Sequence, residues 1–246
     1  MNIATKIIPA PKLTDKVLND MFDYRLGRLR QSMVEQNVSL SILVSPVSLR
    51  YAIDFDEFQL FQSHIPTCYL FVPAEGPIVM HGATRLNFPN VSEYRQPHFI
   101  TPFDSGFDLS NSAKLFGDDV DSFVREHGHN KNIAIERISP LASNSLQNLG
   151  YQISDAECLL EKAKVIKCET EIKCIKYSIE VAEYGLKLMQ ENTFSGLTEL
   201  QVWSILHQVN VANNGSWIEG HMLSSGPRTN PWLQEASERV IETGDM

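Results

Sequence analysis

A long amphipathic stripe in the last third of the chain restricts its fold more than any other feature. Apolar side chains recur there at steps of three and four residues over about five helical turns, with glutamate and lysine opposite. The stripe consists of Ile172, Ile175, Ile179, Ala182, Leu186 and Met189. A helix with one apolar side is stabilised mainly by a layer that covers that side. We therefore predict that the stripe lies in a hydrophobic core.

A second helix is expected soon after the first. Thr198 and Gln201 match a capping box, and the cluster at 213–215 contains asparagine and glycine, which commonly end helices. A strand is predicted over 216–223, followed by a Ser-Ser-Gly-Pro turn. Residues 242–246 are interpreted as a turn that leads into a further strand.

The first 160 residues have a different sequence pattern, in which short apolar runs alternate with helical periodicity. The predicted elements are an extended arm over 1–12, a helix from Phe22, a strand at 40–44, a β-hairpin of 68–72 and 77–80, a loop over 83–110 with one strand near 98–101, a helix at 118–127, a strand at 132–136, a helix at 140–149 and a strand at 151–154. Strands that alternate with helices indicate an α/β domain whose sheet is at least partly parallel.

The net charge excludes several classes of partner. The 246 residues carry 21 basic and 30 acidic side chains, which gives a formal charge of −9. Binding to nucleic acid or to an anionic membrane surface depends mainly on clustered lysine and arginine, which this chain lacks. It has no apolar run long enough to span a bilayer and no secretory signal pattern, so a cytoplasmic protein is expected. Its four cysteines form no C-x-x-C pair and are interpreted as reduced, packed thiols.

Motifs of common enzyme classes are missing from the sequence. It contains no phosphate-binding G-x-x-x-x-G-K, no dinucleotide-binding G-x-G-x-x-G, no H-E-x-x-H and no G-x-S-x-G. His127 and His129 are interpreted as a solvated helix end rather than as metal ligands. The acidic run at 118–121 is interpreted as the first turn of a helix, where carboxylates interact favourably with the helix dipole.

The segment 217–235 concentrates side chains of types that bind ligands. The candidate substrate-binding residues are Trp217, Glu219, His221, Arg228, Asn230 and Trp232. On a strand, the first three share one face. The last three lie in a loop that offers a guanidinium group for a carboxylate and an aromatic face for a cation. Alternatively, the segment is an irregular turn whose tryptophans pack on the two preceding helices, and composition alone leaves both interpretations open.

Four motifs occur together in the first 172 residues. They lie at 25–33, 45–51, 51–55 and 165–172, and the last reads Val-Ile-Lys-Cys-Glu-Thr-Glu-Ile. Their combination resembles the creatinase, prolidase and aminopeptidase P family, whose linker signature has serine where this chain has Cys168. The resemblance implies the α/β fold class, with a creatinase-type N-terminal α/β domain at 1–160 and the first part of an α+β pita-bread catalytic domain at 161–246.

A block at 225–235 resembles most closely the family branch that contains the pita-bread dimethylsulfoniopropionate lyase. Peptidases of the family carry a histidine shortly after the start of this loop, and residues 226–246 contain none, which weakens the peptidase interpretation. The resemblance also places the first metal-binding aspartate a few residues beyond Asp245. The chain is therefore expected to be truncated before its metal ligands, which would lie beyond Met246, and no catalytic residue is identified within it.

The resemblance implies a metal-dependent hydrolase or lyase that acts on a small carboxylate-bearing substrate or a dipeptide. In the complete parent two divalent metal ions (iron, manganese or zinc) are expected, and none is expected to bind to this chain. Trp217 and Trp232 are then candidates for an aromatic box around a sulfonium group, and Arg228 for charge complementarity. A homodimer is expected. The alternative is a non-catalytic remnant that acts as a dimerisation or interaction module through its N-terminal domain.

Overall fold

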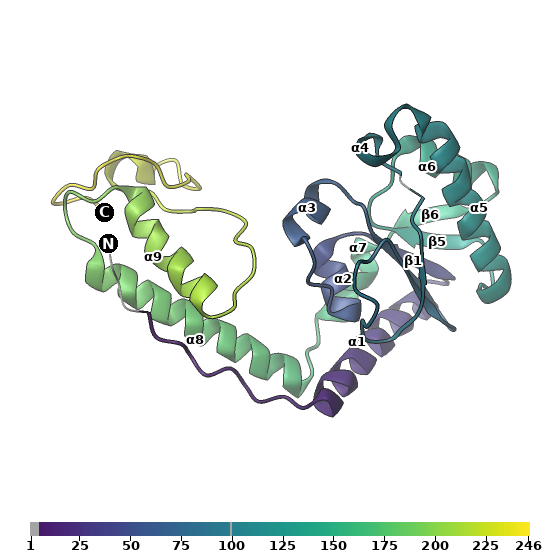
Figure 1. Ribbon diagram of the computed structural model, residues 1–246, viewed down its shortest axis with the longest axis horizontal. Coiled ribbons are helices and arrows are strands. Elements are labelled where there is room, and N and C mark those ends of the chain that lie inside the picture. Colours follow the sequence, from purple (N-terminus) through teal and green to yellow (C-terminus); the bar gives the residue numbers. More distant parts are fainter. Residues whose placement is uncertain (1–4, 99) are drawn as a thin grey trace. The chain divides into compact units, whose positions relative to one another are not determined.

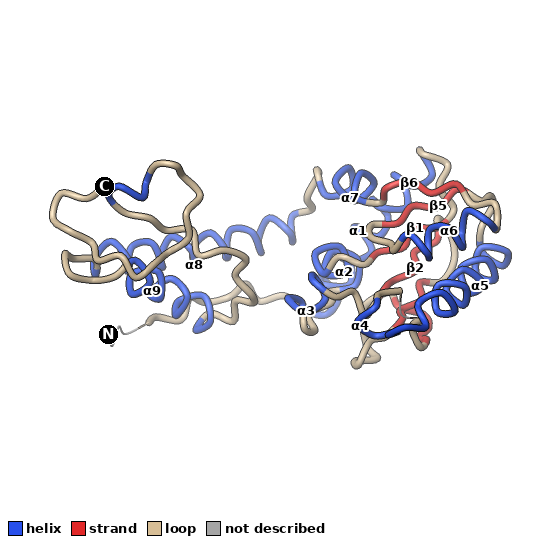
Figure 2. Tube along the Cα trace, turned by 90° about the horizontal axis from the view of Figure 1, so that it is seen from above, coloured by secondary structure: helices blue, strands red, loops and turns tan. Residues whose placement is uncertain are grey.

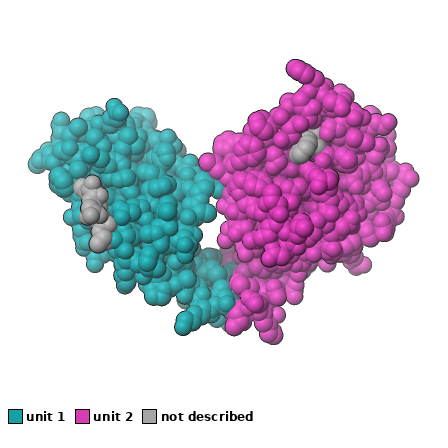
Figure 3. All heavy atoms as spheres, in the orientation of Figure 1, with its two compact units in different colours: residues 1–13, 169–246 teal, residues 14–168 magenta. Residues whose placement is uncertain are grey.

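The computed structural model describes residues 5–98 and 100–246 and divides into two compact units. One unit is Thr14–Cys168, and the other combines Glu169–Met246 with the residues that precede Thr14 (Figure 3). The predicted domains, 1–160 and 161–246, stay a prediction about family architecture, whereas the compact units change over at Cys168.

A six-stranded mixed sheet forms the centre of the unit Thr14–Cys168 (Figure 1). Its strands are β1 (Leu40–Leu43), β2 (Tyr69–Pro73), β3 (Ile78–His81), β4 (Val91–Arg95), β5 (Asn132–Ile135) and β6 (Gln152–Asp155), in the order β4-β3-β2-β1-β5-β6. The β1–β2 and β2–β3 pairs are antiparallel, and the other three pairs are parallel. The predicted hairpin and the partly parallel sheet are therefore confirmed.

Helices cover both faces of this sheet, and Figure 2 shows the strands between them. The helices of the unit are α1 (Asp15–Glu35), α2 (Pro46–Ile53), α3 (Gln59–His64), α4 (Pro102–Ser105), η1 (Gly106–Asp108), α5 (Leu109–His127), α6 (Pro140–Asn148) and α7 (Glu157–Lys164). Side chains alternate along each strand, so Leu70 and Val72 join the core under α1, α2 and α7, while Tyr69 and Phe71 join the core under α5 and α6. Apolar burial on both faces stabilises this unit.

The predicted helices of this unit form, and most begin earlier than expected. Thr14 caps α1 by accepting a hydrogen bond from the Val17 amide, and the apolar positions Phe22, Leu29 and Met33 are buried as predicted. The helix predicted at 118–127 starts instead at Leu109. The extended arm is confirmed for residues 5–12, and residues 1–4 lie outside the described chain.

One prediction about this unit was wrong, and some of its helices were not predicted. The strand expected near 98–101 lies instead at β4, and residues 98, 100 and 101 are irregular, with Phe99 outside the described chain. β4 occupies the edge of the sheet and carries polar side chains, so it has no apolar run to reveal it. Helix α7 was not predicted, because it is short and charged residues interrupt its apolar ones.

The second unit contains two long helices that follow each other in the chain, α8 (Glu169–Asn192) and α9 (Glu199–Ala212). They approach closely at Gly185, where an added Cβ would meet Leu206 at 2.6 Å. The predicted capping box of Thr198 and Gln201 is confirmed, and α9 ends at Asn213 as expected. The arm before Thr14 packs here too, because the Ile8 amide donates to the Asn213 Oδ1 atom at 2.7 Å.

The prediction that the α8 stripe lies in a core was wrong. Ile172, Ile175, Ile179 and Leu186 are 41–57% exposed. The opposite edge of α8 is the more buried one, and its half-buried residues are Cys174, Tyr177, Val181, Tyr184 and Leu188. The Tyr177 hydroxyl there donates to the Asn213 carbonyl at 3.3 Å, and the Tyr184 hydroxyl accepts from the Lys6 amide at 2.8 Å. Because α9 and the arm cover this edge, the stripe stays in solvent among the described residues.

The segment that follows α9 is irregular, so the strand predicted at 216–223 was also wrong. It contains the 3-10 helix η2 (Gly226–Thr229) and two isolated bridges, one between Met222 and Glu235 and one between Val240 and Thr198. The end of the chain returns to the start of α9, where the Glu199 amide donates to the Arg239 carbonyl at 3.0 Å. Every helix in the described part of the chain falls short of what a membrane span requires.

Candidate functional site

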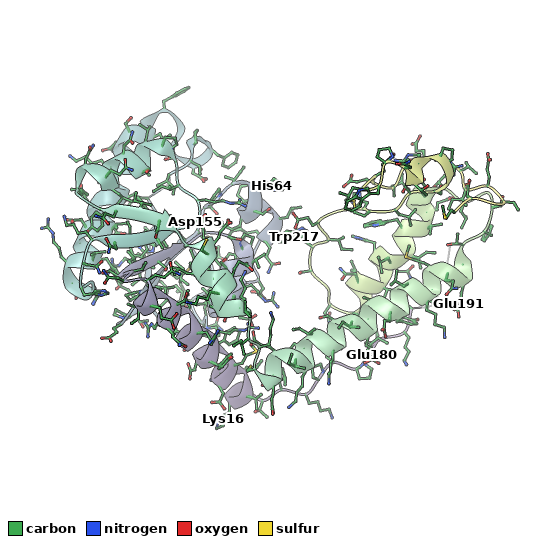
Figure 4. All side chains as sticks on the ribbon, turned by 180° about the vertical axis from the view of Figure 1, so that it is seen from behind. Lys16, His64, Asp155, Glu180, Glu191 and Trp217 are labelled. Carbon is green, nitrogen blue, oxygen red and sulfur yellow. The ribbon has the colours of Figure 1, made fainter. Side chains whose placement is uncertain are left out.

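The predicted substrate-binding residues all lie on the irregular segment 216–246, which follows α9 (Figure 4). Trp217, labelled there, is half-buried, and its indole Nε1 is buried without a hydrogen-bond partner. Glu219 and Asn230 are exposed, and Trp232 is 76% exposed. The tryptophans therefore differ, since one is partly covered by protein while the other presents its ring to solvent.

An aromatic and histidine cluster surrounds His221. The Trp203 ring meets the His221 ring edge to face at 4.4 Å between centroids, and it stacks at a tilt on His207 at 5.1 Å. His221 Nδ1 lies 3.9 Å from Glu235 Oε2, and the two side chains are 48% and 60% exposed, so solvent screens this pair. The sequence predicted His221, but it gave Trp203 and His207 only as helix residues.

Arg228 makes hydrogen bonds to α9 and to later residues of its own segment. Its guanidinium donates to the Glu199 carboxylate, to Ser237 Oγ at 2.7 Å and to the Glu235 carbonyl at 2.8 Å. In this arrangement Arg228 joins the two ends of the loop that contains Asn230 and Trp232. Binding of a substrate carboxylate by Arg228 stays a prediction.

Glu199, the first residue of α9, is the centre of this arrangement and was not predicted. Its side chain is completely buried and accepts five hydrogen bonds. Ser225 donates from its amide (2.7 Å) and hydroxyl (2.8 Å), Ser237 donates from its amide (3.0 Å) and hydroxyl (2.7 Å), and Arg228 donates from its guanidinium. The sequence shows only an acidic residue after a helix cap, because its partners lie far along the chain.

A second ion pair continues the network. Arg239 binds both carboxylate oxygens of Asp245, at 2.6 and 3.0 Å, and donates to Ser225 Oγ at 2.6 Å. We call the six connected residues the polar clamp, namely Glu199, Ser225, Arg228, Ser237, Arg239 and Asp245. Its two carboxylates balance its two guanidinium groups, so the clamp as a whole is neutral.

The carboxylates of the clamp are held in their charged form. Burial raises the pKa of Glu199, but hydrogen bonds from Ser237 and Ser225 outweigh burial, so this pKa lies below its usual value. The Arg239 hydrogen bonds likewise hold the pKa of Asp245 below its usual value. The clamp is therefore intact at neutral pH.

A different buried network lies in the unit Thr14–Cys168. His81 is fully buried and packs against the rings of both Tyr69 and Phe71, each 4.4 Å away between centroids. Its Nε2 lies 3.1 Å from Asp119 Oδ2, and its Nδ1 makes no hydrogen bond. Asp119 also accepts from Arg95 at 3.2 Å. Burial lowers the pKa of His81 more than Asp119 raises it.

The other motifs singled out in the sequence have structural roles. The acidic run at 118–121 lies in the middle of α5 and not in its first turn, because α5 starts at Leu109. Asp121 accepts from the Tyr151 hydroxyl at 2.9 Å. The His127 ring packs on Phe123 at 4.8 Å, at the end of the same helix.

The described residues do not form the metal site that the resemblance implies. Nowhere in 5–98 or 100–246 do three histidine, cysteine, aspartate or glutamate side chains gather closely enough to hold a metal ion. The segment 216–246 contains the Trp217 and Trp232 rings and the polar network around Glu199.

The amino-acid sequence of this chain is similar to those of two lyases. The chain is 32% identical over 240 residues to the dimethylsulfoniopropionate lyase DddP of Roseovarius nubinhibens, covering 93% of the chain and 54% of that relative. It is 30% identical over 234 residues to the DddP lyase of Roseobacter denitrificans, covering 91% and 52%. The chain thus spans about half the length of these curated relatives. No protein-family model matches it.

Two solved structures with a similar fold are peptidases by name. An Xaa-Pro dipeptidase from Bacillus anthracis matches with a TM-score of 0.63 at 18% identity, covering 91% of this chain and 59% of that one. A prolidase from Thermococcus sibiricus matches with a TM-score of 0.65 at 16% identity, with the same coverage. At such low identity these likenesses show the fold alone. They confirm the predicted fold class, and with the lyase relatives they confirm the resemblance to the creatinase, prolidase and aminopeptidase P family.

Proposed function

We propose that this chain is part of a metal-dependent pita-bread enzyme that cleaves dimethylsulfoniopropionate by β-elimination. The observation that carries the proposal is the 32% identity to a dimethylsulfoniopropionate lyase along 93% of the chain. The peptidase likenesses have lower identity, and the segment 226–246 has no histidine at the place where the family's peptidases carry one. Hydrolysis of Xaa-Pro peptides is therefore the less favoured activity.

In the proposed reaction a base removes a proton from the carbon next to the substrate carboxylate. The electrons of that C–H bond form the carbon–carbon double bond, the carbon–sulfur bond breaks, and its electron pair leaves with sulfur as dimethyl sulfide. The other product is acrylate. The two divalent ions implied by the resemblance (iron, manganese or zinc) need ligands that the described residues do not gather, so we assign them no step.

The contribution we propose for this chain is substrate binding. The Trp232 ring, 76% exposed, is available to a sulfonium group, because the face of an indole attracts cations. Trp217 contributes a half-buried ring from the start of the same segment. Arg228 acts through the loop that it holds, since its guanidinium already donates to Glu199, Ser237 and the Glu235 carbonyl.

The test is an assay of this sequence within a protein of its relatives' full length. We expect release of dimethyl sulfide from dimethylsulfoniopropionate only when iron, manganese or zinc is supplied. Trp232→Leu should raise KM by about 5- to 30-fold, because about 1–2 kcal/mol of cation–π attraction is lost. Trp232→Phe is the matched variant and should retain part of the affinity. Absence of dimethylsulfoniopropionate turnover with all three metals contradicts the proposal, whether or not Xaa-Pro dipeptides or creatine are turned over.

The homodimer and the cytoplasmic location stay predictions. The alternative of a non-catalytic interaction module predicts that the chain is monodisperse and complete in its binding function without further sequence. The same assay separates the two, because an interaction module has no turnover under any condition.

A further inference from the structure

The segment 216–246 is ordered almost without apolar burial. Among these residues, all of which the structure describes, Ser225 alone is buried. Leu233 is 59% exposed and Val240 is 47% exposed, so neither supplies a hydrophobic anchor. Apart from the ring contact between Trp203 and His221, the contacts that hold this segment on α9 are therefore mainly polar.

The donors to Glu199 enclose one loop. Ser225 and Arg228 precede the loop, Ser237 follows it, and all three converge on the one buried carboxylate. The loop between them, 229–236, has its two ends tied at a common point, while Trp232 at its tip is exposed. The hydrogen bonds to Glu199 thus hold the two ends of the loop together, while the Trp232 side chain of the loop is exposed to solvent.

We propose that Glu199 is a positioning residue, whose buried carboxylate closes the base of the loop 229–236 and thereby fixes Trp232 for a cationic ligand. The identity of that ligand, a sulfonium compound, rests on the proposed function. The positioning role rests only on the hydrogen bonds of this chain.

Charge explains why a carboxylate is needed at this position. Arg228 and Arg239 both lie in the clamp, and both interact with groups that contact Glu199. A neutral amide at 199 leaves one negative charge, Asp245, for two guanidinium groups. The half-buried Arg228 then loses its charged acceptor, and loss of a hydrogen bond to a charged group costs more than loss of an ordinary one. The loop base should open even though the size of the side chain is unchanged.

Hydrogen exchange of the 246-residue chain, read by mass spectrometry, tests this role. We expect Glu199→Gln to speed exchange over 225–237 by at least about tenfold, because charge-assisted hydrogen bonds are lost. Exchange in α8 and in the sheet should be unchanged. Glu238→Gln is the matched control, because Glu238 is exposed and lies next to the clamp, and it should change nothing. Ser237→Ala is a milder variant that should speed exchange a few-fold in the same segment.

Two results overturn the positioning role. One is unchanged exchange over 225–237 in Glu199→Gln, and the other is an equal increase throughout α8 and α9, which marks general destabilisation. In the full-length protein of the proposed function, Glu199→Gln should raise KM about tenfold and leave kcat nearly unchanged. If the unmodified protein has no turnover, the proposed function fails, while the exchange measurement still decides whether Glu199 positions the loop.

Discussion

The two compact units are stabilised by different interactions. In Thr14–Cys168 a mixed sheet is covered on both faces, and its largest side chains are completely buried. In Glu169–Met246 the apolar stripe of α8 is exposed, and a network of charges and hydroxyl groups holds the segment after α9. The first unit should therefore respond to changes of volume and the second to changes of charge.

The largest effect is expected from a cavity in the sheet core. Phe71 is fully buried and packs against Tyr69, His81 and Phe123. Phe71→Ala should lower the free energy of unfolding of Thr14–Cys168 by about 3–5 kcal/mol, measured by denaturant titration with circular dichroism. The comparison fails if this substitution destabilises 225–237 more than it destabilises the sheet.

A smaller loss of stability is expected on acidification. The two units should lose stability in different pH ranges. The pKa of His81 lies below its unfolded value of about 6.5, so the unfolded state binds a proton first and stability falls as pH drops below that value. The groups that face His81 are Tyr69, Glu93, Arg95, His98 and Asp119. The lowered pKa of Glu199 acts in a different window, because its contribution is complete above about pH 4.3 and is lost below it.

Denaturant titrations between pH 7 and 5 check this separation. The sheet unit should lose stability over that range, while exchange over 225–237, corrected for the intrinsic effect of pH, should be constant. His81→Phe keeps an aromatic ring beside Tyr69 and Phe71 and removes the titrating group. If the loss of stability toward pH 5 is the same in His81→Phe, another group causes it.

The smallest effect is expected on the α8 stripe. Ile179 is 51% exposed, whereas Ile42 in β1 is 1% exposed, and the two provide a matched pair of substitutions. Ile179→Ala should change stability by less than about 0.5 kcal/mol, against about 2–5 kcal/mol for Ile42→Ala. Equal costs in thermal denaturation would mean that the stripe is covered in solution.

The sequence predicted what local patterns determine. The hairpin of β2 and β3, the buried positions of α1 and the capping box at Thr198 depend on residues close together in the chain. The side of α8 that it predicted to be covered was the wrong one. That helix has apolar residues on two sides, and α9 with the N-terminal arm covers the side of Tyr177 and Tyr184.

The segment 216–246 was predicted only in part. Its unusual composition marked Trp217, His221 and Trp232, but the strand expected at 216–223 is reduced to a single bridge between Met222 and Glu235. The importance of Glu199 follows from Ser225 and Ser237, which lie 26 and 38 positions further along the chain. No local sequence pattern identifies such a residue. Its role becomes visible only in the folded chain, where its side chain is buried and accepts hydrogen bonds from distant residues.

Residue-resolved amide exchange of the unmodified chain, measured by nuclear magnetic resonance, tests the central claim most directly. The amides of Ser225 and Ser237 donate to the buried Glu199 carboxylate and should exchange at least about tenfold more slowly than the amide of Glu238, after correction for intrinsic rates. Equal corrected rates for these three amides would contradict the account, because the polar clamp would then not be what holds the segment in place.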